Sequence, residues 1–274
     1  MKKYAFYLIV IYIFLRLFNI NNFEDLNKTL SRAWDERDNF IELVTEAFSE
    51  VEEDYDNIYN DDLKYISASE KIKKDVENNR DMFLTVRISK DEEAYIFSDV
   101  NFSLKINSTS LKDAGLNMFR KIEDTKAEDI EDLKIIGGSN IYSLDDLIDI
   151  VDEENYKGNL YLYLADSKGE AADAILNEVK DLKVTILVDN KKDYDKVEFD
   201  NKGLYIKDDI KLDENIEFAI VREEYIKSNH KNINRLFAIK TALNEKFKVN
   251  EINSLDKKYK TNGFVVSNIE DILK

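Results

Sequence analysis

Apolar and polar positions divide the chain into an apolar start, a helical segment, and a longer part in which short strands alternate with helices. No charged residue occurs from Tyr4 to Leu15, and with Leu17 to Ile20 the apolar run reaches about 17 residues, near the lower limit for a membrane-spanning helix. Two lysines precede the run, and no small residues suited to signal cleavage follow it. We therefore expect a single-pass membrane anchor at residues 1–21, with the amino terminus inside and the bulk of the chain extracytoplasmic. The alternative is a buried or interfacial helix, because the run is short for a bilayer.

A helical pattern follows from Phe23 to about Ile58, where apolar residues recur at intervals of three and four. This stripe could pair with a second copy as a coiled-coil stalk, or it could fold back on a helix that opens near Ser67 to Glu70. We favour the hairpin, because Arg37 interrupts a seam that is short for an independent coiled coil. The sequence thus predicts a helical stalk or hairpin at 22–81, with residues 30–58 as a candidate surface for a protein partner or self-association.

Strand patterns begin at Met82. Alternating residues at 83–88, 94–97 and 102–106 predict an antiparallel meander, and a helix is expected after Ser110. Together these segments predict a small antiparallel β plus helix region at 82–125.

After residue 126 the pattern changes to strands separated by helices. Short apolar strands are predicted at 133–136, 160–164, 184–188, 216–221 and 264–266, and helices at 169–182 and 232–247 and after Ser143. Strand, helix, strand with short connections predicts a parallel sheet. We therefore expect an α/β protein whose residues 126–274 form a doubly wound parallel sheet domain.

Composition limits the chemistry that the chain can perform. A net charge of -17 and a pI near 4.7 exclude nucleic acid as an expected partner, because phosphate backbones bind to lysine and arginine. The chain has no cysteine and only one histidine, His230, which excludes disulfides, thiolate chemistry and multi-histidine metal sites. We predict no metal and no cofactor.

Candidate ligand-binding residues come from the rule that ligands collect outside the carboxyl ends of parallel strands. The segment 166–170 is the most suggestive, because a small polar loop that opens a helix presents free N–H groups to an anion. The simpler alternative is that Asp166 or Ser167 only caps that helix. The candidate residues are Gly138, Ser139, Asp166, Ser167, Lys168, Gly169, Asp189 and Arg222.

No segment matches a recognisable catalytic motif, so we assign no catalytic residue. The sequence favours a membrane-anchored, extracytoplasmic binding, scaffold or sensor protein. The alternative is an enzyme, a hydrolase or transferase, that acts on a phosphate-bearing or glycan substrate at the crevice formed by the strand ends.

Overall fold

The computed structural model describes residues 63–68, 71–100, 102, 106–107, 120–131, 133–135, 141–165, 170–240, 247–267 and 269. The chain divides into two compact units, Met1–Asn57 and Ile58–Lys274, and every described residue belongs to the second. The predicted anchor at 1–21 and the helical stripe at 30–58 therefore lie outside the described residues.

No helix in the described part of the chain is long and apolar enough to cross a membrane. The membrane and signal-anchor assignment made from the sequence thus finds no support in the described residues, and the segment on which it depends lies outside them.

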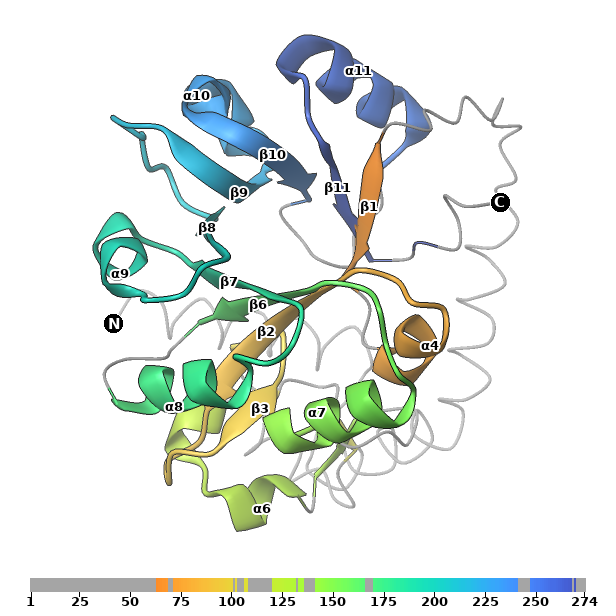
Figure 1. Cartoon of the computed structure of the whole chain (residues 1–274), viewed down its shortest axis with the longest axis vertical. Helices are drawn as coiled ribbons and strands as arrows, with labels where there is room; N and C mark the ends of the chain where they lie inside the picture. The colour runs from red at the N-terminus through yellow and green to blue at the C-terminus, as the bar shows by residue number, and fades with distance from the viewer. Residues whose placement is uncertain are drawn as a thin grey trace, which may run out of the picture. The chain divides into compact units, whose positions relative to one another are not determined.

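The main sheet closes into a barrel (Figure 1). Its nine strands follow the order β1-β11-β10-β9-β8-β7-β6-β2-β3, and β1 also pairs with β2, where Ser67 lies opposite Met82. All pairings within the closed ring are parallel, whereas β3 (Ala94–Ile96) joins β2 antiparallel. The ring strands are β1 (Lys64–Ser67), β2 (Met82–Ile88), β6 (Leu160–Leu164), β7 (Val184–Val188), β8 (Lys202–Ile206), β9 (Ile216–Arg222), β10 (Ile233–Ile239) and β11 (Gly263–Val266).

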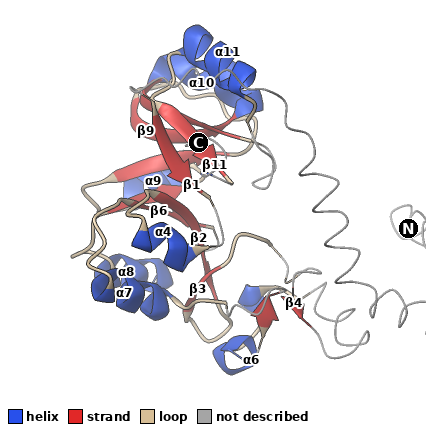
Figure 2. Ribbon diagram, turned by 90° about the vertical axis from the view of Figure 1, so that its right-hand side faces the viewer, coloured by secondary structure: helices blue, strands red, loops and turns tan. Residues whose placement is uncertain are grey.

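Among the described residues, the helices are α4 (Ile72–Glu77), α6 (Ala127–Glu131), α7 (Leu144–Glu153), α8 (Glu170–Glu178), α9 (Lys191–Lys196), α10 (Ile226–Asn229) and α11 (Val249–Tyr259). The same part of the chain contains single turns of 3-10 helix at η1 (Ile122–Asp124), η2 (Glu223–Tyr225) and η3 (His230–Asn232). A separate antiparallel pair joins β4 (Ile106–Asn107) to β5 (Lys134–Ile135). Helices α7, α8, α10 and α11 lie outside the strands (Figure 2).

The parallel α/β arrangement predicted from the sequence is confirmed, but the open, doubly wound sheet is not. The closing strand β1 lies in the segment that was assigned to a helical hairpin, and without it the sheet has two free edges. The expected meander at 82–106 is correct only for β2 with β3, because β2 also pairs in parallel with β6. Strands β1 and β2 thus pair with strands that follow residue 126.

The segment predicted as a helix at 232–247 contains strand β10 instead. Both faces of this strand are buried: Phe237 and Ile239 face the barrel interior, while Leu236 and Ala238 pack in the outer layer. A strand buried on both faces lacks the alternation of apolar and polar residues that identifies a strand. Its continuous apolar residues are therefore easily taken for a helix.

Aromatic side chains fill the barrel. Tyr161 stacks on Phe218 with ring centroids 5.3 Å apart, and Tyr163 meets Tyr205 edge to face at 4.8 Å. A second apolar layer packs outward-facing strand residues against the helices, as where Leu144 and Leu147 of α7 join a cluster with Leu162 of β6. Because side chains alternate between these two layers, the residue after each strand end has a defined direction.

Candidate functional site

Three neighbouring strands bring polar residues to the carboxyl end of the barrel, which we call the mouth. Strands β7, β8 and β9 place Leu187, Tyr205 and Ile220 in the interior. The residues two positions later share that direction, since side chains alternate along a strand. They are Asp189, Lys207 and Arg222. This end of a parallel barrel is where active sites form, because loops of many strands converge there.

Asp189, Lys207 and Tyr163 form one hydrogen-bonded group. Lys207 Nζ lies 2.8 Å from Asp189 Oδ2 and donates to the Tyr163 hydroxyl at 2.5 Å. That hydroxyl donates in turn to Asp189 Oδ2 at 2.9 Å. The side chains of Lys207 and Asp189 are 29% and 27% exposed, so the ion pair sits partly out of solvent but remains accessible from the mouth.

Contacts within this group shift the pKa values of Asp189 and Tyr163. Burial alone would raise the pKa of Asp189, but hydrogen bonds from Lys207, Asn190 and Tyr163 outweigh it and hold the pKa below the usual 3.8. Burial, and then the charge of Asp189, raises the pKa of Tyr163. Asp189 is therefore ionised and Tyr163 neutral at ordinary pH.

Arg222 contributes a second cation. Its Nε atom is buried and has no hydrogen-bond partner within the described part of the chain. Burial lowers the pKa of Arg222, but a hydrogen bond with Tyr205 and electrostatic interactions with Tyr205, Glu224 and Asp208 together outweigh it, so the net shift of the pKa is upward. A buried donor that lacks a partner costs free energy, which a bound acceptor would recover.

Arg87 adds positive charge to the same end of the barrel. It lies near the end of β2, is 7% exposed, and donates from Nε to the carbonyl oxygen of Phe97 at 3.2 Å. Its charge reaches the interior, because it acts to lower the pKa of Tyr163. Arg87, Lys207 and Arg222 thus bring three cations to the end of the barrel that holds Asp189, where Asp208 and Glu224 also act on Arg222, on a chain whose net charge is -17. Such a mouth suits an anionic ligand.

The sequence-based candidates are only partly placed by the structure. Asp189 and Arg222 both lie in the mouth, whereas the other six, Gly138, Ser139, Asp166, Ser167, Lys168 and Gly169, lie outside the described residues. No group of three or more metal-binding side chains (His, Cys, Asp or Glu) occurs among the described residues.

Sequence reasoning missed three members of the site. Lys207 follows a strand by the same rule that selected Asp189, but β8 begins with Lys202 and Gly203, and its segment was not among the apolar strands predicted from the sequence. Tyr163 lies in the strand predicted at 160–164 and Arg87 in the strand predicted at 83–88, and neither was singled out as a site residue. The strand-end rule could have found Lys207, whereas Tyr163 and Arg87 required the barrel.

The barrel resembles solved phosphodiesterase structures. A glycerophosphodiester phosphodiesterase from Parabacteroides distasonis aligns with a TM-score of 0.57 and 9% identity, covering 77% of this chain and 95% of that chain. A phosphodiesterase from Oleispira antarctica, in complex with the product sn-glycerol-3-phosphate, aligns with a TM-score of 0.53 and 11% identity over 77% of this chain and 95% of that chain. No family model matches the sequence, and no curated protein matches it at a significant level.

At this identity the likeness establishes the fold, a parallel α/β barrel of the kind seen in glycerophosphodiester phosphodiesterases. The neighbours are hydrolytic enzymes, and this finding overturns the prediction of a non-catalytic binding, scaffold or sensor protein. Of the two interpretations made from the sequence, the enzyme alternative fits better.

Proposed function

We propose that this protein is a hydrolase that cleaves a phosphodiester at the barrel mouth. The observation that carries the proposal is the buried, unpartnered Nε of Arg222, which lies in a mouth shared with Lys207 and Arg87. Two oxygens of a phosphodiester carry the negative charge, and a guanidinium and an ammonium are the side chains that bind such oxygens best. The three cations favour a phosphate-bearing substrate over a neutral glycan.

The geometry supports a reaction after which Asp189 and Lys207 have regained their starting protonation states. Arg222 and Lys207 would stabilise the charge that develops on the phosphoryl oxygens. Water attacks phosphorus and gives a proton to Asp189, while the P–O bond to the alcohol breaks and the leaving oxygen takes a proton from Lys207. Because Asp189 Oδ2 and Lys207 Nζ lie 2.8 Å apart, the proton on Asp189 can then pass to Lys207. Asp189 is a weak base while Lys207 contacts it, and a phosphate that draws the ammonium away would raise its pKa.

Hydrolysis of bis(p-nitrophenyl) phosphate and of a glycerophosphodiester by the purified full chain tests the proposal. Arg222→Gln should lower kcat/KM at least about 100-fold, the usual cost of removing a donor to a transition-state oxyanion. Asp189→Asn and Lys207→Gln should lower kcat. Arg235→Gln is the matched control. It removes an arginine from the amino-terminal half of β10, away from the mouth, and should keep wild-type activity.

Two results would overturn this function. One is a wild-type chain that hydrolyses neither substrate, with and without added divalent cations. The other is hydrolysis that survives Arg222→Gln and Lys207→Gln unchanged, since the activity would then come from elsewhere on the protein or from a contaminant.

A further inference from the structure

A pocket of about 200 Å³ lies at the end of the barrel opposite the mouth. It is formed by the end of α7 with the turn that follows, the beginning of β6, and the residues that lead into β7. Leu160 and Lys183, at the amino-terminal ends of β6 and β7, place it there. The pocket is therefore separate from Asp189, Lys207 and Arg222.

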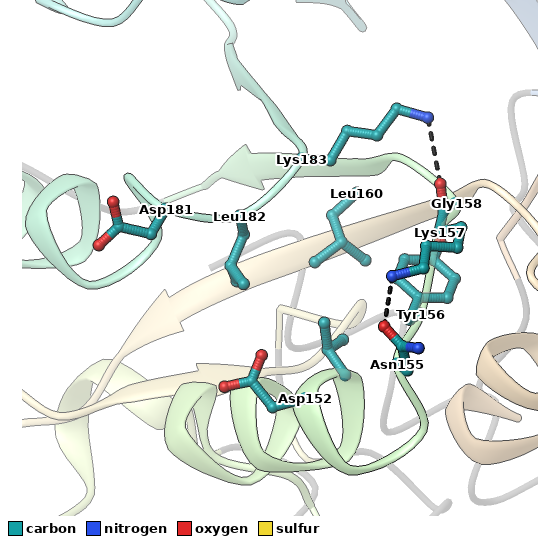
Figure 3. A pocket seen from close by; sticks show the side chains of 10 residues that line it. Asp152, Asn155, Tyr156, Lys157, Gly158, Leu160, Asp181, Leu182 and Lys183 are labelled. Atoms are coloured by element: carbon teal, nitrogen blue, oxygen red, sulfur yellow. Dashed lines mark hydrogen bonds between the residues drawn. The ribbon is translucent and has the colours of Figure 1, made fainter.

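The charged groups of this pocket are sorted into two ends (Figure 3). The carboxylates of Asp152 and Asp181 lie at one end, and the ammonium groups of Lys157 and Lys183 lie at the other. Nothing in the sequence pattern predicts this sorting, because Asp152 comes from α7 and Asp181 from the turn after α8. The pocket is thus acidic at one end and basic at the other.

Two leucines also line the pocket. In Figure 3, Leu182 lies near the two carboxylates, and Leu160 lies between it and the two lysines. Leu160 is only 1% exposed, because its other contacts are with the outer core layer. A ligand that crosses from one end to the other would therefore pass over Leu182, which is the more accessible of the two leucines.

Both ends retain hydrogen-bonding capacity for a ligand. Lys183 Nζ donates to the backbone oxygen of Lys157 at 3.1 Å, and Lys157 Nζ contacts Asn155 Oδ1. An ammonium has three N–H donors, so each lysine can donate further. Neither carboxylate pairs with any other side chain in the described part of the chain.

From this arrangement we propose that the pocket binds a small zwitterion, a molecule of amino-acid size with an ammonium at one end and a carboxylate at the other. The ligand's ammonium would face Asp152 and Asp181, and its carboxylate would face Lys157 and Lys183. The size agrees, because drug-sized sites begin at roughly 300 Å³ and a cavity of about 150 Å³ holds benzene. The proposal does not depend on the hydrolase function.

The test is an NMR titration of the full chain that follows the amide signals of Gly158 and Leu182, which line the pocket. The probes are β-alanine, γ-aminobutyrate and ε-aminocaproate, which differ only in the distance between their charges. Butylamine and butyrate carry one charge each and serve as single-charge controls. We expect one zwitterion to saturate both signals, with a Kd lower than that of either control, since it alone reaches both ends.

Variants assign the binding to the two ends. Asp181→Asn and Lys183→Gln should each weaken the affinity about threefold, the effect expected of an exposed ion pair. Glu153→Gln, on α7 but outside the lining, is the matched control and should leave the Kd unchanged.

Three outcomes would overturn the proposal. They are the absence of saturable shifts with all three zwitterions, binding of a single-charge control as tightly as the best zwitterion, and a Kd that neither variant changes. A melting curve for each variant confirms that it is folded, which is expected because Asp181 and Lys183 are exposed.

Discussion

Asp189 stays ionised because three donors converge on it, from Lys207, Asn190 and Tyr163. Its exposure is small enough for these bonds to contribute to stability and large enough for a ligand to displace one of them. The same contacts therefore hold the mouth together when it is empty and set the basicity of its carboxylate. Lys207 is the donor that an anion would attract first, because it is the one that carries a charge.

The lowered pKa of Asp189 predicts that the free energy of unfolding depends on pH. Since the folded pKa lies below the unfolded value of 3.8, the ionised form stabilises the fold above that pH, and the contribution is lost as the pH falls through the lower folded value. Asp189→Asn should therefore cost about 1–2 kcal/mol at pH 7. Urea unfolding at pH 7 and below pH 3.8 measures this, with Asp195→Asn, an exposed aspartate on α9, as the control. An equal loss at both pH values would show that the charge of Asp189 does not stabilise the fold.

Among single residues of the site, the sequence identified only those at the ends of apolar strands. Asp189 and Arg222 were found because each comes directly at the end of a clear apolar strand. The contact between Asp189 and Tyr163 depends on the parallel pairing of β6 with β7, in which Tyr163 lies opposite Leu187. Pairing of that kind is a tertiary property, so the site's internal bonds could not be read from the chain.

Elements with local signals were predicted well, and elements stabilised by the barrel were not. Helix α7 begins where expected because Ser143 caps it through its own side chain. Strand β10 was mistaken for a helix and β1 was missed, since their burial comes from neighbours distant in the sequence. The four residues of β1, Lys64–Ser67, are too few to show a period.

The cap of α7 can be tested alone. Ser143 Oγ accepts from the backbone N–H of Asp146 at 3.0 Å, and Asp146 Oδ2 accepts from the backbone N–H of Ser143 at 2.9 Å. Ser143→Ala should lower the free energy of unfolding by about 1 kcal/mol, because it leaves one of these donors without its partner. Ser143→Asp keeps an acceptor in place and should lose less. If the two variants are equally stable by urea unfolding, the cap is not what stabilises the start of α7.

The closing strand pair supplies a second test. A Cβ atom at Gly263 would collide with the backbone oxygen of Lys64 and lie 2.6 Å from Phe237 Cε1. Backbone cannot move aside as a flexible side chain can, so Gly263→Ala must separate β11 from β1. We expect a loss of at least about 2 kcal/mol, within the range for overpacked cores. A thermal melt that is unchanged by this methyl group would mean that β1 and β11 are not in close contact.

Closure determines which part of the chain can fold as a unit. An open sheet tolerates loss of an edge strand, but a barrel that loses one strand gains two exposed edges. Strand β1 joins β11 to β2 and buries Ile66 completely in the interior. A sheet domain that begins near residue 126, as predicted from the sequence, would fold without β1. The closed barrel requires β1.

Two fragments compare these expectations directly. A fragment of residues 58–274 contains all eight ring strands and should unfold in one cooperative transition, whereas a fragment of residues 69–274 lacks β1. We expect the shorter fragment to lose that transition or to aggregate, because Phe83 and Val265, both in the interior with Ile66, would face water across the gap. Circular dichroism melting and sedimentation measure the two properties. If residues 69–274 melt as cooperatively as residues 58–274, β1 is dispensable and the molecule behaves as an open sheet. If only the longer fragment melts cooperatively, the barrel is closed in solution.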